Sequence, residues 1–158
     1  MKVLFLDRDG IINRERGDYT WKKKDFQFTD NLFQFLGRCQ KAGFAFIVIT
    51  NQGGIDKGLY TKKEVEDLHQ WMKEEFEQRG TPLVDVYYCP HHDQLQKCLC
   101  RKPGSLMVEK ALATFSIDSD ASLMIGDRQR DVQAALNAGI RGILIDSNPD
   151  WKSIEVPN

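Results

Sequence analysis

Two carboxylates and a glycine follow a short apolar run near the start of the chain. Val3 to Leu6 is apolar, and Asp7, Arg8, Asp9 and Gly10 come directly after it. A continuous apolar run is typical of a buried parallel strand, and ligands bind beyond the carboxyl ends of such strands. Two acids this close repel each other unless a bound cation keeps one ionised while the other holds a proton. From this segment alone, a strand end followed by an Asp-rich turn is an equally good interpretation.

Further polar side chains that could bind a cation or a phosphate follow strands predicted later in the chain. A second buried strand, 44–49, is predicted to end at Thr50. A fourth strand, 122–125, leads into Asp127, and Lys102 precedes a predicted helix start. Mg²⁺ prefers few carboxylates together with phosphate oxygens, and phosphoryl transfer needs positioning and charge neutralisation above all. The set fits a phosphate held between Mg²⁺, Lys102 and Thr50 and facing a carboxylate nucleophile.

Each of these residues also has an ordinary explanation when it is taken alone. Thr50 can cap a turn, and Lys102 can be one solvated lysine among many. Asp127 to Asp131 can be a helix start whose acids suit the helix dipole. Their order along the chain and their shared placement at strand ends favour the joint prediction of a phosphate site.

A second cluster of chemically active residues combines thiols and imidazoles. Cys89 is followed by the pair His91-His92, and Cys98 and Cys100 follow within a dozen residues. Three thiols and one imidazole suit tetrahedral Zn²⁺, which would close the polar loop between them. Incidental cysteines, or a disulfide in an oxidising compartment, are the alternatives. Spacing alone does not choose between His91 and His92.

The elements that must position these groups alternate between strand and helix. Short apolar runs predict buried strands, and segments with helical spacing between them predict helices. Such alternation predicts βαβ units and an α/β fold with a doubly wound, Rossmann-like parallel sheet. The predicted elements are, in order, strand 3–6, a long loop over 11–25, helix 30–42 with Asp30 as N-cap and Leu32, Phe33, Leu36 and Cys39 inward, strand 44–49, helix 61–79, strand 84–88, an irregular segment 89–101, helix 104–115, strand 122–125, helix 132–138 and strand 142–145.

Length and composition bound the class of protein. The 158 residues, 41% hydrophobic and 28% charged, predict a single domain, 1–158, that buries a core without disulfides. A net charge of −1 gives no basic surface, so neither nucleic acid nor a membrane is an expected partner. No signal-peptide or membrane-span pattern is visible, which favours a cytoplasmic protein. We expect a monomer.

The phosphate-site residues resemble a known superfamily. Asp-Arg-Asp-Gly, the Thr50 strand end, Lys102 and Gly-Asp-x-x-x-Asp are similar, in order, to the four motifs of the haloacid dehalogenase-like (HAD-like) phosphatases, over essentially the whole chain. The resemblance implies that Asp7 is the nucleophile and forms an aspartyl-phosphate, and that Asp9 protonates the leaving alkoxide and then activates water. Asp7, the Asp9 carbonyl and Asp127 would hold the catalytic Mg²⁺. Thr50 and Lys102 would bind the transferring phosphoryl group.

The cysteine segment looks like the zinc-bearing branch of this superfamily. That branch includes the D-glycero-D-manno-heptose 1,7-bisphosphate 7-phosphatases and the histidinol-phosphate phosphatases. In both, the first histidine after Cys-Pro is the ligand, so the resemblance implies a closed, structural Zn²⁺ site. Zinc would fix the approach of Arg101 and Lys102 to the phosphate, and Asp131 would orient a water or Lys102. The implied zinc ligands are Cys89, His91, Cys98 and Cys100.

Loops rather than a lid are expected to determine the substrate. The intervals between the motifs leave no obvious room for a cap domain, so the site should be capless and open. The segments 50–55 and 17–28 are similar to those of the heptose enzymes. Arg128, however, stands where those enzymes commonly have lysine, and the Pro-Gly-Met run of many heptose enzymes is missing after Pro103. The heptose resemblance implies these substrate contacts: Glu15, Arg16, Gly17, Asp18, Asn51, Gln52, Gly53, Arg101 and Arg128.

The expected substrate is a small phosphorylated sugar. The first choice is the 7-phosphate of heptose 1,7-bisphosphate, on the route to ADP- or GDP-heptose and the lipopolysaccharide core. The alternative is histidinol phosphate of histidine biosynthesis. Arg101, Arg128 and Arg16 suit a second phosphate better than a cationic amine, although Glu15 and Asp18 could receive that amine. A non-catalytic phospho-receiver module would leave the second acid and the zinc loop unexplained.

Overall fold

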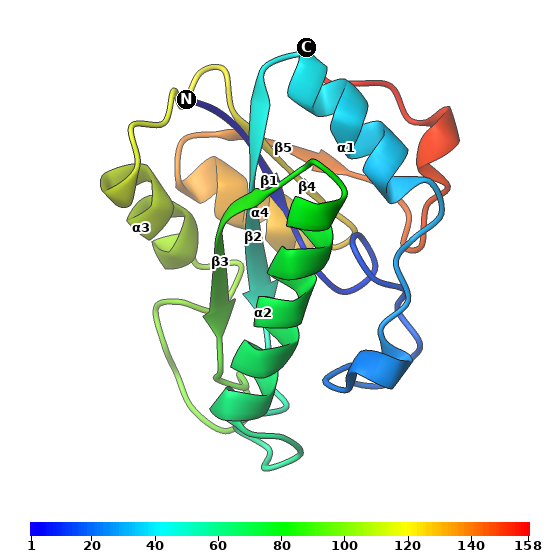
Figure 1. Cartoon of the computed structure of the whole chain (residues 1–158). Helices are drawn as coiled ribbons and strands as arrows, with labels where there is room; N and C mark the ends of the chain where they lie inside the picture. The colour runs from blue at the N-terminus through cyan, green and yellow to red at the C-terminus, as the bar shows by residue number, and fades with distance from the viewer.

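The computed structural model, which describes residues 1–158, is built on a five-stranded sheet whose paired strands are all parallel. The strand order is β3-β2-β1-β4-β5, with β1 at the centre (Figure 1). The chain adds β2 and β3 on one side of β1 and then crosses over to add β4 and β5 on the other, as predicted for a doubly wound sheet. The elements are β1 (Lys2–Leu6), η1 (Lys23–Asp25), α1 (Leu32–Lys41), β2 (Phe44–Asn51), α2 (Lys62–Gln78), β3 (Leu83–Cys89), α3 (Leu106–Thr114), β4 (Leu123–Gly126), α4 (Gln129–Asn137), β5 (Arg141–Leu144) and η2 (Trp151–Ser153).

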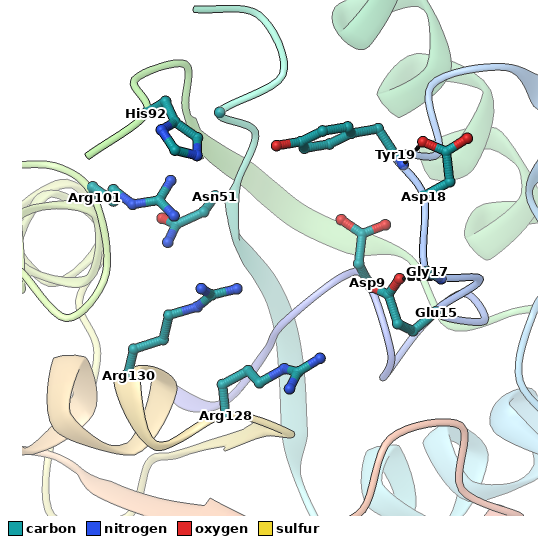
Figure 2. Close-up of a pocket in the computed structure, with 11 residues that line it drawn as sticks. Asp9, Glu15, Gly17, Asp18, Tyr19, Asn51, His92, Arg101, Arg128 and Arg130 are labelled. Atoms are coloured by element: carbon teal, nitrogen blue, oxygen red, sulfur yellow. Dashed lines mark hydrogen bonds between the residues drawn. The ribbon is translucent and has the colours of Figure 1, made fainter. Parts of the chain in front are cut away.

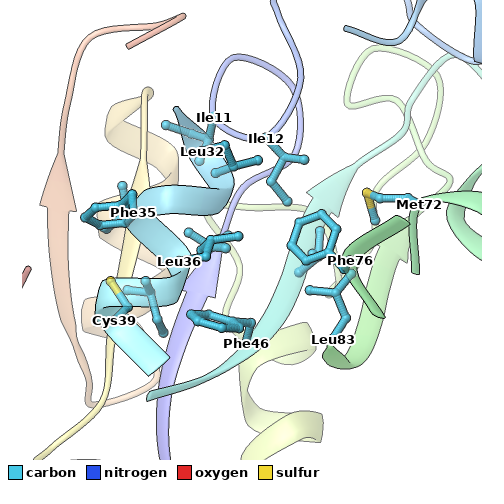
Figure 3. Packing of buried hydrophobic residues seen from close by; sticks show 14 of the residues in the cluster. Ile11, Ile12, Leu32, Phe35, Leu36, Cys39, Phe46, Met72, Phe76 and Leu83 are labelled. Carbon is cyan, nitrogen blue, oxygen red and sulfur yellow. The ribbon is translucent and has the colours of Figure 1, made fainter. Parts of the chain in front are cut away.

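Helices cover both faces of the sheet, and each face has its own apolar cluster. On one face α1, α2 and η2 pack around Leu4 and Leu6. Figure 3 shows part of this cluster, with Phe35, Phe46 and Phe76 among its members. On the other face α3 and α4 pack around Val3 and Phe5. Successive strand residues point to opposite faces, so a strand covered on both sides needs an apolar residue at every position. This explains why β1 is a continuous apolar run rather than an alternating one.

The start of α1 differs from the prediction. The helix begins at Leu32, and Asn31 rather than Asp30 is the N-cap residue, with φ of 62° in the left-handed region. Asn31 tolerates that conformation because its short polar side chain reduces the steric cost. The Asp30 carboxylate instead forms an ion pair with Arg14 at 2.9 Å. The carboxylate therefore fastens the loop after β1 to the chain just before α1.

Trp151 gives the weakly patterned C-terminal segment a structural role. Its fully buried ring stacks on Phe35 of α1, with ring centroids 4.4 Å apart. Its indole nitrogen donates to Thr29 Oγ1 at 2.8 Å. Phe35 is buried completely, whereas Phe33, which was predicted to point inward, is only partly buried. The tail thus covers the outer side of α1 at a position that helical periodicity did not mark.

Three other boundaries affect the functional residues. β2 is longer than predicted and includes Thr50. α2 begins at the predicted capping box, in which Thr61 Oγ1 accepts from the Glu64 backbone and Glu64 accepts from the Thr61 backbone. α4 begins at Gln129 rather than Val132, so the residues directly after β4 form its first turn.

The carboxyl ends of β1, β2 and β4 meet at one edge of the sheet, near the switch point between β1 and β4. The segment between β1 and α1 contains only loops and η1, and the segment between β3 and α3 contains no helix or strand. The predicted capless architecture with an irregular cysteine segment is confirmed. None of the helices combines the length and the apolar character that crossing a membrane would need.

Candidate active site

Asp7, directly after β1, is paired with Lys102. The ammonium group of Lys102 lies 2.7 Å from Asp7 Oδ1 and 2.7 Å from Asp131 Oδ1, and it donates to the Ile49 carbonyl at 2.8 Å. Only 1% of Lys102 is exposed. Burial opposes the positive charge of Lys102, but the two carboxylates outweigh burial and raise its pKa. Lys102 is therefore a fixed cation beside Asp7.

Three carboxylates gather at this edge of the sheet without enough positive charge to balance them. Asp7, Asp127 and Asp131 place oxygens within 4.8 Å of one another. Burial raises the pKa of Asp7 to about 8; Lys102 opposes this rise, and the negative charges of Asp131 and Asp127 add to it. A hard divalent cation would relieve this repulsion.

The hydrogen bonds separate the roles of these acids. Asp131 faces Lys102 with one oxygen and accepts from the Arg128 backbone with the other, at 3.1 Å. Asp127 Oδ2 accepts from Ser147 at 2.6 Å, but its Oδ1 is buried with no hydrogen-bond partner. An orphaned buried carboxylate oxygen beside Asp7 is a free ligand atom for Mg²⁺. The residues therefore fit a magnesium ion on Asp7 and Asp127, with Asp131 committed to Lys102.

Gly10 allows Asp127 to approach β1. Its φ is +88°, and a Cβ at this position would collide with the Asp127 carboxylate. Gly126 plays the same part for Asp131, because a Cβ there would collide with the Asp131 side chain. Both glycines lie in the motifs that were singled out from the sequence, and close approach is the physical reason for them.

The Asp9 carboxylate accepts hydrogen bonds from three side chains. Oδ1 accepts from Arg8 Nη2 at 2.8 Å and from Asn13 Nδ2 at 3.0 Å. Oδ2 accepts from Gln52 Nε2 at 3.0 Å. Burial favours the neutral acid, but the charge of Arg8 and these hydrogen bonds outweigh burial and lower the pKa of Asp9. Asp9 is held in one orientation before any substrate binds.

Arg8 supports Asp9 from inside the protein. It is completely buried, which arginine tolerates only when it is paired. Besides Asp9, its guanidinium contacts the Thr20 carbonyl and His69 Nε2, the latter at 3.0 Å. Burial and the charge of Arg8 lower the pKa of His69 to about 3, so the neutral imidazole accepts the hydrogen bond. The sequence did not reveal this partnership, because His69 could be either a surface or a core residue of the predicted helix 61–79.

The end of β2 carries the next two polar side chains. Thr50 is almost completely buried, and its Oγ1 accepts from Gln52 Nε2 at 2.9 Å. Asn51 bonds the backbone of Lys102 in both directions, accepting at 2.9 Å and donating at 3.2 Å. This pair of bonds fastens the segment that carries Lys102 to β2 and so determines where the lysine enters the site.

A cavity of about 460 Å³ opens beside Asp9. Figure 2 shows that its two sides differ in charge. One side carries Arg101, Arg128 and Arg130, which we call the arginine wall, together with His92. The opposite side carries Glu15, Asp18 and Tyr19. The lining residues are Asp9, Glu15, Gly17, Asp18, Tyr19, Asn51, Gly53, His92, Arg101, Arg128 and Arg130.

Two of the substrate contacts implied by the sequence do not line this cavity. Arg16 folds back on its own loop, where it donates to Thr20 Oγ1 at 3.1 Å and to the Tyr19 carbonyl at 3.0 Å. Gln52 lies behind Asp9 and is only 2% exposed. The structure places the other implied contacts, from Glu15 to Arg128, on the cavity surface.

Three residues that line the cavity were not predicted from the sequence: Tyr19, His92 and Arg130. Arg130 lies between the two acids of the Gly-Asp-x-x-x-Asp motif, and an α4 start at Gln129 would have directed attention to it. Arg130 has no ion pair or side-chain hydrogen bond, and the nearest carboxylate oxygen to Arg128, on Asp127, is 3.9 Å away. Arg101 donates only to a backbone carbonyl, that of His91, at 3.0 Å. The arginine wall therefore keeps its positive charge available for an anion.

The four predicted zinc ligands converge. Cys89 Sγ lies 3.0 Å from Cys100 Sγ and 3.7 Å from Cys98 Sγ. His91 Nδ1 lies 3.2 Å from Cys100 Sγ and 3.4 Å from Cys89 Sγ. Zn–S bonds of about 2.3 Å in a tetrahedron place sulfurs about 3.7 Å apart. The Cys89–Cys98 distance matches this value and the other separations are shorter, so the four side chains lie close enough together to share one Zn²⁺. None of the four cysteines of the chain forms a disulfide in the structure.

The neighbouring histidine has a different position. His92 lines the cavity, and its backbone nitrogen donates to Asp56 at 2.9 Å. Arg101 is tied to the cysteine cluster twice, through its backbone nitrogen to Cys98 Sγ at 3.4 Å and through its guanidinium to the His91 carbonyl. The cluster thus holds one member of the arginine wall in place.

Comparison with known proteins agrees with this geometry. Residues 99–150 match the HAD-hydrolase-like family model. The chain is 40% identical, over 94% of its length and 86% of the relative, to the D-glycero-beta-D-manno-heptose-1,7-bisphosphate 7-phosphatase of Helicobacter pylori. It is 38% identical, over 89% of its length and 79% of the relative, to the alpha-heptose enzyme of Photorhabdus laumondii.

A solved structure with a similar fold is the D,D-heptose 1,7-bisphosphate phosphatase from B. bronchiseptica, complexed with magnesium and phosphate. Its TM-score is 0.85 at 27% identity, covering 98% of this chain and 86% of that one. The chain therefore belongs to the HAD-like hydrolases, in the family of the D-glycero-D-manno-heptose-1,7-bisphosphate 7-phosphatases.

Proposed function

We propose that the protein is a Mg²⁺-dependent phosphatase that removes the 7-phosphate of D-glycero-D-manno-heptose 1,7-bisphosphate, on the route to ADP- or GDP-heptose and the lipopolysaccharide core. The observation that carries the proposal is the charge distribution of the cavity. The buried Asp7–Lys102 pair does not line the cavity itself, but Lys102 is bonded to Asn51, which does line it. The arginine wall lies on one side of the same cavity. A substrate with two phosphates uses both features.

In this proposal Asp7 attacks the 7-phosphate and becomes an aspartyl-phosphate, while the sugar oxygen leaves with a proton from Asp9. Asp9 then takes a proton from a water molecule as the water oxygen attacks the phosphorus. The bond between phosphorus and the Asp7 oxygen breaks, which releases inorganic phosphate and regenerates the Asp7 carboxylate. Lys102 and Thr50 bind the transferring phosphoryl group. The chain's part is positioning and charge neutralisation, which is what phosphoryl transfer requires.

The metals have separate parts. Asp7, the Asp9 carbonyl and Asp127 would hold Mg²⁺, which supplies charge neutralisation at the reacting phosphate when bound. The orphaned Asp127 oxygen supports this assignment. Cys89, His91, Cys98 and Cys100 would hold Zn²⁺ in a closed structural site.

The arginine wall favours the bisphosphate over histidinol phosphate. Histidinol carries an amine where the bisphosphate carries an anion, and Arg101, Arg128 and Arg130 repel a cation. Glu15 and Asp18, on the opposite side, suit sugar hydroxyls as hydrogen-bond acceptors. Relatives named for the alpha and the beta anomer are 38% and 40% identical to this chain, so the proposal concerns position 7 and not one anomer.

Substitution of the two aspartates tests the proposed chemistry. Asp7→Asn should abolish phosphate release, because a carboxamide cannot form the acyl-phosphate. Asp9→Asn should bind substrate but turn over ~10²–10⁴-fold more slowly. EDTA should stop the wild-type reaction, and added Mg²⁺ should restore it. Phosphate release and the identity of the remaining sugar phosphate are the readouts, and near-wild-type turnover by Asp7→Asn would refute the mechanism.

A further inference from the structure

We propose that Gln52, locked by Tyr60, is a positioning residue that aims both Asp9 and Thr50 at the substrate. This inference rests on the proposed phosphatase function. Gln52 does not line the cavity, so it does not act as the substrate contact that its motif implied. It lies instead at the junction of three side chains, Asp9, Thr50 and Tyr60.

The Gln52 amide uses both hydrogens of its NH₂ group on residues of the reaction. One bond runs from Nε2 to Asp9 Oδ2 at 3.0 Å, and the other from Nε2 to Thr50 Oγ1 at 2.9 Å. A carboxylate accepts but does not donate, so the NH₂ end of the amide must face Asp9. The carbonyl end then points away from the site, toward Tyr60.

Tyr60 fixes this orientation from the other end. Its hydroxyl donates to Gln52 Oε1 at 2.7 Å, and its side chain is almost completely buried. A rotated amide would place its carbonyl against the Asp9 carboxylate and would lose the hydrogen bond from Tyr60. Leaving buried polar groups unpaired in this way is costly. One amide orientation is therefore strongly preferred, and it serves both residues at once.

The bond from Gln52 also determines what Thr50 can do. A hydroxyl has one hydrogen to donate, and Thr50 Oγ1 already accepts from Gln52. The hydrogen of Thr50 makes only a long contact of 3.4 Å, to the Asn51 carbonyl. It is therefore available to a phosphoryl oxygen. Gln52 thus prepares Thr50 as a donor while it holds Asp9 Oδ2, the oxygen with fewer protein donors, in place.

Gly54 and the aromatic rings of Trp21 and Tyr19 hold Tyr60 in this position. A Cβ at Gly54 would collide with the Tyr60 ring, so the glycine makes room for it. The ring then stacks on Trp21, with centroids 5.9 Å apart, and meets the edge of Tyr19 at 6.0 Å. Tyr19 itself lines the cavity. The aromatic group therefore connects the loop that contacts substrate with the amide that orients the reacting groups.

The test compares variants on substrates that differ in their leaving group. Tyr60→Phe keeps the stacked ring and removes only the hydroxyl, and Gln52→Leu removes the amide. Each variant and the double variant are assayed for kcat/KM with heptose 1,7-bisphosphate and with p-nitrophenyl phosphate. The aryl leaving group departs without a proton, so it depends little on Asp9. Tyr88→Phe is the control, because it removes a hydroxyl bond of the same 2.7 Å length, to the exposed Glu66, without touching Gln52.

We expect Tyr60→Phe to lower kcat/KM for the bisphosphate about tenfold, because that substrate depends on both Asp9 and Thr50. The aryl phosphate needs Thr50 but depends little on Asp9, so its kcat/KM should fall no more than about threefold. The double variant should be no worse than Gln52→Leu alone, because Tyr60 acts only through the amide. Equal losses on both substrates, losses that multiply in the double variant, or a Tyr60→Phe enzyme with unchanged kinetics would overturn the inference.

The test still decides the inference if a variant does not fold or if the substrate assignment is wrong. If Gln52→Leu fails to fold, the leaving-group comparison for Tyr60→Phe alone carries the decision. If the wild-type enzyme prefers histidinol phosphate, the proposed substrate fails. That compound is also an alkyl phosphate, so it replaces the bisphosphate and the same ratio to the aryl phosphate decides the inference.

Discussion

Single side chains at this site are held by partners before substrate arrives. Lys102 is fixed by Asp7 and Asp131, and Asp9 accepts from three donors. In contrast, the guanidinium groups of Arg128 and Arg130 make no close ion pair. The reacting groups are thus preorganised, which lowers the cost of reaching the transition state. Arg128 and Arg130 therefore keep their hydrogen-bond donors for the substrate.

Arg130 offers a prediction at the residue scale. A charge-assisted hydrogen bond to a remote phosphate contributes ~1.5–3 kcal/mol, so Arg130→Ala should lower kcat/KM for the bisphosphate about tenfold or more. Turnover of p-nitrophenyl phosphate, which lacks a second phosphate, should change little. Lys110→Ala, which removes one charge from the exposed side of α3, is the control. Equal effects of the two substitutions would mean that only net charge matters.

Elements carry the functional residues into place, and two of them do so by linking distant parts of the chain. The cysteine segment after β3 ties Arg101 to the zinc ligands. α2 brings His69 against Arg8, which in turn holds Asp9. Neither link follows from local periodicity. From the sequence, His69 could be either a surface or a core residue, and the identity of its partner depends on how the loop after β1 folds.

Metal content tests the cysteine segment. Purified protein should contain about one zinc per chain, as expected for a closed four-ligand site. Removal of the zinc should lower the melting temperature of the protein. It should also raise KM for the bisphosphate, because the cysteine segment would no longer hold Arg101 in place. The absence of zinc, together with free titration of Cys89, Cys98 and Cys100 under native conditions, would contradict the assignment.

The buried His69 predicts how stability depends on pH. Its pKa is about 3 in the fold against 6.5 for an ordinary histidine, so the unfolded chain binds the proton first. The contribution of His69 to stability is complete above pH 6.5. It decreases by up to about 1.4 kcal/mol per pH unit as the pH falls toward 3.

His69→Gln keeps an acceptor for Arg8 but does not titrate. Urea unfolding at pH 7 and pH 5 should therefore show a smaller loss of stability in the variant than in the wild type. The same loss in both proteins would contradict the role given to His69.

At the scale of the whole molecule, the parallel sheet explains how much the sequence could predict. The carboxyl ends of parallel strands share one edge, so ordered motifs at strand ends must converge. Asp7 and Asp127 do so directly, and Thr50 is linked to Asp9 through Gln52. What the sequence did not reveal depends on tertiary contacts. Trp151 reaches Phe35 across the chain, and Arg130 enters the cavity only because α4 begins early.

The same architecture leaves the site without a cap, so selectivity must come from the charged walls of the cavity. The acidic side, with Glu15 and Asp18, belongs to the loop after β1, and the arginine wall belongs to the cysteine segment and α4. Opposite charges on opposite sides orient a substrate whose two ends differ. In a sugar bisphosphate, the hydroxyls can face the acidic side while the second phosphate faces the arginine wall. The amine of histidinol phosphate suits the acidic side, but the arginine wall repels it.

The most direct test measures kcat/KM for D-glycero-D-manno-heptose 1,7-bisphosphate and for histidinol phosphate on one preparation with Mg²⁺. We predict at least a tenfold preference for the bisphosphate, with heptose 1-phosphate as the product that remains. A tenfold preference for histidinol phosphate, or release of the 1-phosphate instead, would contradict the account.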